Sequence, residues 1–163
     1  KIYGEKPEAI TYINAEGCYL TSADLTKLPN LDILNLNHNE LADIDLSKNT
    51  KIRALYVSDN PFTESTPLVI GEKDSLILLE IPMVGYLDPN FDLTKYPKMK
   101  SFDAYYTRTL TKIDPTNCPD LLPALAYLER ERDEGYRAGL EPKQGVAGAV
   151  LHTCVGFCEQ GGV

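Results

Sequence analysis

Apolar residues return at a fixed interval along much of the chain. Between Leu31 and Phe62 one pattern of apolar and asparagine positions occurs twice, with the second copy 21 residues after the first. The first copy comprises Leu31, Leu34, Leu36, Asn39 and Leu41, and the second comprises Ile52, Leu55, Val57, Asn60 and Phe62. A repeat of about 20–50 residues indicates a solenoid, in which each repeat forms one coil.

The pattern extends in both directions from this pair of repeats. Coil starts fall at positions 10, 31, 52, 76, 99 and 121, so successive coils are 21 to 24 residues long. A polar head, Asp-Leu-Thr-Lys or a close variant, returns in phase at Asp24, Asp45 and Asp92. We therefore divide the chain into a polar lead-in (1–9), a repeat region (10–121) and a tail (122–163).

Each coil is predicted to contribute one short strand. Leu34 and Leu36 alternate with Ile33, Asn35 and Asn37, which is the period of two expected of a half-buried strand. The strands of successive coils would stack side by side as a parallel sheet. Because one coil cannot bury its apolar face alone, neighbouring coils are expected to share a continuous core.

A polar position follows each of the regular strands. Asn39 and Asn60 stand where the chain turns inward, and asparagine offers both a donor and an acceptor, so we predict that they satisfy buried backbone groups. Cys18 occupies the same position in the first coil and is predicted to be a small buried residue. Val84 and Thr107 replace asparagine in the fourth and fifth coils.

These positions follow the pattern L-x-x-L-x-L-x-x-N/C-x-L, and the chain resembles the leucine-rich-repeat family. The stretch from Asp45 to Asn60, DLSKNTKIRALYVSDN, is similar to the short-period bacterial type found in surface proteins of bacteroidetes and in internalin-like adhesins. The resemblance implies an α/β fold: a right-handed, horseshoe-shaped leucine-rich-repeat solenoid with a parallel concave sheet. It also implies a secreted or cell-surface bacterial protein.

The composition changes abruptly after Leu121. Residues 122–163 contain no Asn, Ile or Ser. Leu122 to Arg137 reads as a helix, because Leu121, Leu125 and Leu128 lie at helical spacing among good helix formers. The simplest role for this helix is a C-terminal cap over the last coil. The segment from Gly145 to Val163 is interpreted as an edge strand or an extended cover, and a tail of non-native origin stays open.

Charge and hydropathy exclude several classes of partner. The net charge of −8 and the pI near 4.7 argue against nucleic acid or an anionic membrane surface, which both require basic clusters. The sequence has no apolar run long enough for a transmembrane helix, so no membrane insertion is expected. The chain begins at Lys1 without a visible signal peptide, and we interpret it as a mature or trimmed chain.

Two short motifs resemble metal sites but are incomplete. His152, Cys154 and Cys158 form H-x-C-x3-C without the second pair that zinc sites usually have, so packed or free thiols are the default, with a disulfide or zinc as alternatives. Asp88 to Asp92 reads D-x-N-x-D, yet the glycine and the bidentate glutamate of a calcium loop are missing. Cys118 is predicted to be buried apolar filler. No metal or cofactor is expected.

Catalysis has no clear candidates either. The chain has two histidines, His38 and His152, and neither belongs to a nucleophile motif. No phosphate-binding glycine motif is present. The sequence therefore predicts that the protein is not an enzyme.

The remaining candidate is a surface. In register, the concave face would display tyrosine, asparagine and acidic side chains, a mixture that suits contacts with a protein or a glycan. Leu78, on the same face, is read either as a covered patch or as part of a partner site. The predicted function is non-enzymatic binding, and the alternative is a structural spacer in a longer surface protein. The predicted contact residues are Tyr12, Asn14, Asn35, Asn37, Tyr56, Ser58, Glu80, Asp103 and Tyr105.

Overall fold

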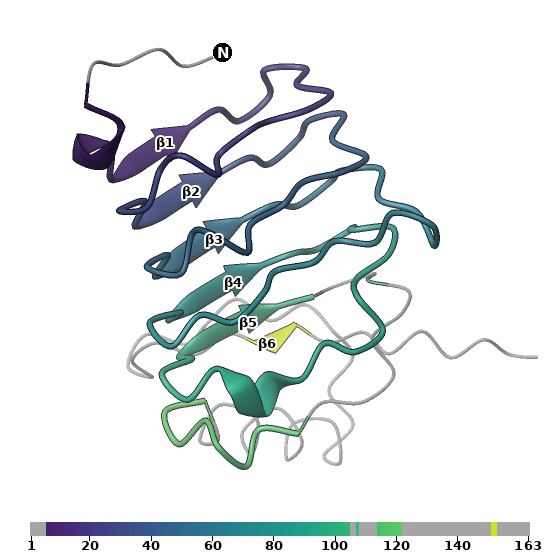
Figure 1. Ribbon diagram of the computed structural model, residues 1–163. Helices are drawn as coiled ribbons and strands as arrows, with labels where there is room; N and C mark the ends of the chain where they lie inside the picture. The colour runs from purple at the N-terminus through teal and green to yellow at the C-terminus, as the bar shows by residue number, and fades with distance from the viewer. Residues whose placement is uncertain (1–5, 105–106, 108–113, 122–150, 153–163) are drawn as a thin grey trace, which may run out of the picture.

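The computed structural model describes residues 6–104, 107, 114–121 and 151–152, and it shows a parallel β-solenoid (Figure 1). Each of the first five coils contributes one short strand to a single sheet, and the six strands of this sheet lie in the order of the chain. Two single-turn 3-10 helices, η1 (Pro7–Ala9) and η2 (Leu93–Lys95), interrupt the connecting segments. The strands are β1 (Tyr12–Asn14), β2 (Ile33–Asn35), β3 (Ala54–Tyr56), β4 (Leu78–Glu80), β5 (Ser101–Asp103) and β6 (Leu151–His152).

The strand register follows the repeat. Leu34 of β2 pairs with Ile13 of β1 on one side and Leu55 of β3 on the other. Leu55 pairs in turn with Leu79 of β4, which pairs with Phe102 of β5. These are the apolar positions that the sequence places in equivalent slots, so the predicted parallel solenoid is confirmed.

The core lies directly behind the sheet. The central residue of each strand from β1 to β5 is buried, while its two neighbours are exposed or half-buried. Leu31, Leu41 and Leu46 reach the same core from the turns and the return path, and all three are fully buried. Each fully buried aliphatic side chain contributes about 1.5–3 kcal/mol of transfer free energy. The burial therefore forms one apolar column along the solenoid.

The C-terminal end of the sheet differs from the sequence expectation. The sixth coil was expected to continue from Leu121, but residues 122–150, including the predicted helical cap, lie outside the described residues. The strand beside β5 is β6, whose residues Leu151 and His152 pair in parallel with Phe102 and Asp103. This strand falls in the segment for which an edge strand was one of the two interpretations.

The return paths of the third and fourth coils approach each other closely at Gly85. A Cβ atom placed on Gly85 would lie 2.3 Å from the carbonyl oxygen of Phe62, much closer than two such atoms can approach. The backbone amide of Leu68 donates to Tyr86 O nearby, at 2.8 Å, so the two coils are held at this separation. Glycine is therefore required here by space.

Gly85→Ala is expected to lower the free energy of unfolding by about 2 kcal/mol, because the clash involves backbone that cannot move without disturbing the coil spacing. Denaturant unfolding measures the change. Gly17→Ala is the comparison: its Cβ meets nothing within 4 Å, but its φ of +62° adds about 1 kcal/mol of backbone strain. A Gly85→Ala variant as stable as the wild type would contradict the close approach.

Candidate ligand-binding face

The outward side chains of the strands form rows that run across the solenoid. We call this surface the sheet face. The strand register aligns its first two rows, and its third row consists of the positions two residues beyond the second. The rows are Tyr12, Ile33, Ala54, Leu78 and Ser101; Asn14, Asn35, Tyr56, Glu80 and Asp103; and Glu16, Asn37, Ser58 and Pro82.

The structure places most of the predicted contact residues on this face, with different exposure. Tyr12 is 59% exposed and Asn14 is also exposed. Ser58 is only 6% exposed and offers little surface to a partner. Tyr105 lies outside the described residues. The other predicted residues are half-buried: Asn35, Asn37, Tyr56, Glu80 and Asp103.

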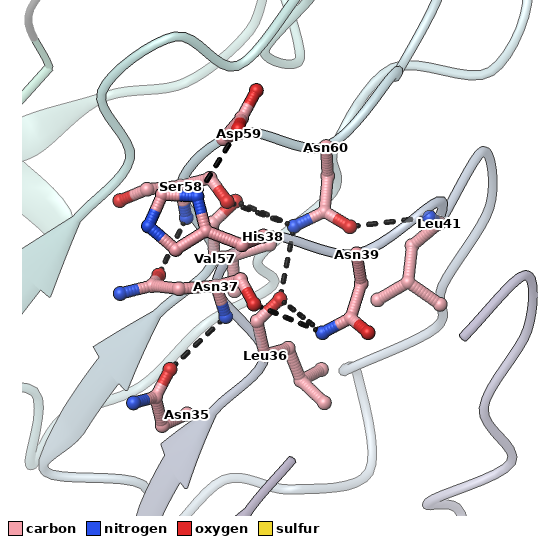
Figure 2. A network of polar contacts seen from close by, with 10 residues as sticks. All are labelled: Asn35, Leu36, Asn37, His38, Asn39, Leu41, Val57, Ser58, Asp59 and Asn60. Atoms are coloured by element: carbon pink, nitrogen blue, oxygen red, sulfur yellow. Dashed lines mark hydrogen bonds and ion pairs between the residues drawn. The ribbon is translucent and has the colours of Figure 1, made fainter. Parts of the chain in front are cut away.

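Hydrogen bonds orient the asparagine side chains of the sheet face. The backbone amide of Ser58 donates to Asn37 Oδ1 at 2.8 Å, and that of Asn37 donates to Asn35 Oδ1 at 3.0 Å (Figure 2). Asn35 Nδ2 donates to the Glu16 carboxylate at 3.0 Å. The backbone therefore holds the side-chain amides of Asn35 and Asn37 in place before any ligand binds.

The face becomes acidic toward β4 and β5. Tyr56 lies in register between Asn35 and Glu80, and Glu80 lies in register with Asp103. Partial burial, and then the Asp103 carboxylate, raise the pKa of Glu80. The pKa of Tyr56 is also raised. Burial is the largest cause, and the Glu80 carboxylate and Tyr12 add to it. The two carboxylates therefore share a partly desolvated part of the sheet.

An asparagine ladder supports the carboxyl ends of the strands. Asn39 Oδ1 accepts from the amides of Cys18 and Leu20, and its Nδ2 lies 2.9 Å from both Ala15 O and Leu36 O. Asn60 repeats the arrangement one coil later with Leu41 N and Leu36 O, as Figure 2 shows. The predicted role of the asparagines is confirmed.

The ladder also changes at its two ends. Thr107 takes the asparagine position in the fifth coil and donates to Ile81 O at 2.8 Å, so a hydroxyl replaces the amide. Val84 fills the position in the fourth coil as a buried apolar residue. The prediction that Cys18 is buried is wrong: Cys18 is exposed, because within the described residues the first coil has no preceding coil to cover it.

A second ladder lies on the opposite side of the core, and sequence reasoning missed it. Asn49 Nδ2 donates to Leu25 O and Leu28 O in the preceding coil, at 2.9 and 3.0 Å. Lys73 Nζ donates to Leu46 O and Asn49 O, at 2.8 and 3.2 Å, although the side chain is fully buried. The sequence feature that could have revealed this ladder is that Asn49, Lys73 and Cys118 occupy the same position within their coils.

Cys118 is the last residue of this second ladder in the part of the chain that the structure describes. It is buried as predicted, but its thiol lies 3.4 Å from both Leu93 O and Tyr96 O, so it is more than apolar filler. Burial raises the pKa of the Cys118 thiol, with Asp114 and Asp92 as further causes. Tyr96, one coil earlier, donates its hydroxyl to Gly71 O at 2.9 Å. Four different side chains therefore bind the carbonyls of neighbouring coils.

Comparison with known proteins identifies the architecture. No family model matches the chain, and no curated protein sequence matches it significantly. A solved structure is similar, namely the functional domain of InlJ from Listeria monocytogenes, which includes a cysteine ladder and is an internalin with leucine-rich repeats. The TM-score is 0.54 at 22% sequence identity, over 62% of this chain. The fold is that of a leucine-rich repeat. The match covers only 21% of the InlJ chain, so this chain corresponds to a small part of that protein.

The turns of the leucine-rich repeat share one backbone conformation. Gly17, His38, Asp59 and Met83 occupy the same position in successive coils, and all four have φ between 51° and 62°. The exposed His38 ring lies 3.1 Å from the Asp59 carboxylate. A shallow hollow of about 460 Å³ lies beside these turns, with Tyr19 and Met83 among its lining residues. This hollow is separate from the sheet face.

The incomplete metal motifs have structural roles where they are described. Asp88 Oδ1 accepts from the amide of Asn90 at 2.8 Å, and Asp92 Oδ1 accepts from that of Thr94 at 3.0 Å. Asp24, Asp45 and Asp114 form the same turn at the heads of their coils. Among the described residues, no group of three His, Cys, Asp or Glu side chains could hold a metal ion. Residues 153–163, with Cys154 and Cys158, lie outside this part of the chain.

Within the residues that the structure describes, no helix has both the length and the apolar character needed to cross a bilayer.

Proposed function

We propose that this leucine-rich repeat is a non-enzymatic binding module that contacts a protein or a glycan through the sheet face. The observation that carries the proposal is the register of that face. Tyr56 stands between Asn35 and Glu80 on adjacent strands, so an aromatic ring, an amide and a carboxylate lie side by side. Aromatic side chains supply large contact area at interfaces, and amides supply hydrogen bonds.

The rigidity of the face supports the same proposal. The asparagine side chains accept hydrogen bonds from the backbone, and the strands rest on a fully buried core. A surface that is ordered before binding loses little conformational entropy when a partner docks. The proposed contact residues are those predicted from the sequence except the buried Ser58, with Tyr12 and Tyr56 as the aromatic anchors.

The wider biological setting is part of this proposal. We infer a right-handed horseshoe in which the sheet lines the concave side and a helical segment after Leu121 caps the last coil. We also infer a secreted or cell-surface bacterial protein with an adhesive or recognition role. The similarity to InlJ from Listeria monocytogenes and the repeat pattern support the horseshoe and the surface location, and the helical spacing of Leu121, Leu125 and Leu128 supports the cap.

The test compares two triple variants on an array of host extracellular proteins and glycans. Tyr56→Ala/Glu80→Ala/Asp103→Ala is expected to weaken binding at least tenfold without lowering the melting temperature, because these side chains face outward. The matched control, Tyr19→Ala/Asp43→Ala/Glu64→Ala, removes the same residue types from exposed positions away from the sheet face and is expected to bind like the wild type. A partner that still binds both variants would show that the contact lies outside these positions of the sheet face.

The alternative is a structural spacer with no ligand of its own. It is supported by the small share of the InlJ chain that this chain covers, since a short run of coils can simply extend a longer repeat array. The spacer hypothesis predicts that neither the wild type nor the variants bind any member of the array.

A further inference from the structure

The asparagine side chains on the β1 to β3 part of the sheet face all have the same orientation. The backbone amide of Glu16 donates to Asn14 Oδ1 at 3.1 Å. The backbone amides of Asn37 and Ser58 donate in the same way to Asn35 and Asn37. The oxygen end of each side-chain amide is thus bound to the backbone. The nitrogen end, which can only donate, points away from these backbone amides, as Figure 2 shows for Asn35 and Asn37.

The hydrogen-bonding capacity that remains here consists mainly of donors. Asn35 Nδ2 gives one of its two hydrogens to the Glu16 carboxylate, at 3.0 Å. The Nδ2 atoms of Asn14 and Asn37 donate to no other group among the residues that the structure describes. Each of these nitrogens carries two hydrogens. This part of the sheet face therefore presents fixed N–H donors to a partner.

A matching ligand supplies acceptors without an equal number of donors and without negative charge. The net charge of −8 repels carboxylate and phosphate groups. Sugar hydroxyls and the backbone of an ordinary extended strand donate as well as accept. Proline has a backbone carbonyl and no N–H group. A proline-rich segment therefore offers neutral acceptors alone.

Apolar and aromatic side chains lie beside the amides. Ile33 and Ala54 are half-buried and adjacent in register, and Tyr12, 59% exposed, continues their row on β1. Tyr56 is two residues beyond Ala54 on β3. Neighbouring strands are about 4.8 Å apart, so β1 and β3, with the two tyrosines, are separated by about 10 Å. One turn of a polyproline II helix, three residues, spans about 9 Å, so prolyl rings one turn apart can reach both tyrosines.

We propose that the sheet face binds a proline-rich segment of a partner protein in the polyproline II conformation. The carbonyl groups of the segment accept from Asn14 and Asn37. Its prolyl rings pack against Tyr12 and Tyr56. This inference rests on the proposed binding function and names the chemistry of the partner. A polyproline II segment has no internal hydrogen bonds and is preformed, so it binds aromatic-lined surfaces with little loss of entropy.

The probe is a fluorescein-labelled decaproline peptide, and the control is a labelled Gly-Ser peptide of the same length, which has backbone N–H groups and no rings. Anisotropy titrations are expected to show that the wild type binds decaproline at least tenfold more tightly than the control peptide. Asn14→Asp/Asn37→Asp keeps an oxygen for each backbone amide and replaces the outward donor by an acceptor. This double variant should bind decaproline at least fivefold more weakly, with the melting temperature of the wild type.

Two further variants complete the comparison. Asn90→Asp/Asn117→Asp makes the same chemical change at exposed positions away from the sheet face, and it should alter the affinity for decaproline less than twofold. Tyr12→Ala removes an exposed ring that the core does not need, and it should weaken decaproline binding at least fivefold.

Equal binding of decaproline and the Gly-Ser peptide would overturn the inference. It would also be overturned if Asn14→Asp/Asn37→Asp bound decaproline as tightly as Asn90→Asp/Asn117→Asp does. The proposed function is tested separately on the array. An array partner that has no proline-rich segment and is lost in the sheet-face triple variant would leave the proposed function intact and overturn this inference.

Discussion

Asn39→Ala is expected to lower the free energy of unfolding by about 3 kcal/mol. The Asn39 side chain accepts from two backbone amides and donates toward backbone carbonyls in two coils, and the residue is only 7% exposed. Alanine removes the side-chain partner of all these groups, of which the Leu36 carbonyl is buried and the contacts with Cys18, Leu20 and Ala15 are partly buried. Each buried polar group left unsatisfied costs about 1–3 kcal/mol. Because some of these backbone groups can relax, the expected loss of stability is well below the sum of the individual costs.

Urea unfolding of the variant and the wild type gives this difference directly. Asn90→Ala is the matched control, because Asn90 is exposed and its contacts are to the neighbouring Asp88. Its effect is expected to be within about 0.5 kcal/mol. An Asn39→Ala variant with the stability of the wild type would show that the asparagine ladder does not hold the coils together.

The stability of the wild type is expected to rise by about 2 kcal/mol between pH 7 and pH 9.5, because Lys73 loses its proton in the core. Burial lowers the pKa of Lys73 from 10.5 to about 8, and Asp45 opposes part of this shift. The folded state therefore binds the Lys73 proton more weakly than the unfolded state. The cost of burying the charge is present below pH 8 and disappears as the pH rises from 8 toward 10.5.

Lys73→Met isolates this contribution, because its side chain has similar length and no charge. Unfolding free energies measured across the range should rise with pH in the wild type and stay comparatively level in Lys73→Met. Tyr96 sets the upper limit of the useful pH range. Burial raises the pKa of Tyr96 to about 12. Above pH 10 the tyrosine therefore ionises in the unfolded state first, and the stability of the folded state falls. Parallel profiles for the two proteins would contradict the buried, weakly basic lysine.

The sequence predicted the solenoid because its strongest signal is the apolar spacing. Leu34, Leu55 and Leu79 occupy equivalent slots and become register partners in the sheet. The asparagine ladder was predictable for a related reason: Asn39 and Asn60 are polar residues at a fixed position beside a buried strand. The outward rows of the sheet face followed directly from this register.

The second ladder was not predictable from residue type. Asn49, Lys73 and Cys118 share a position, but they have different chemistry, and a lysine is ordinarily expected to be solvated. Only the three-dimensional placement shows that Lys73 Nζ reaches two carbonyl groups inside the core. The exposure of Cys18 was missed for the opposite reason, since a residue in an inward slot stays exposed where no neighbouring coil covers it.

The backbone conformation of the turns was also difficult to predict from the sequence. His38, Asp59 and Met83 adopt positive φ, although this region favours glycine. Gly17 at the equivalent position in the first coil was the available signal. The repeated geometry of neighbouring coils fixes this conformation, so side chains at this position vary while the backbone does not.

Oxidative footprinting of tyrosine shows whether a partner binds the sheet face, because the repeat carries accessible tyrosines both on and off this face. Tyr12 and Tyr56 belong to the face, whereas Tyr19 lines the hollow beside the turns and is 80% exposed. Modification rates are measured with and without the partner found on the array. We expect the bound partner to slow the modification of Tyr12 and Tyr56 and to leave that of Tyr19 unchanged. Protection of Tyr19 with no change at Tyr12 and Tyr56 would contradict it.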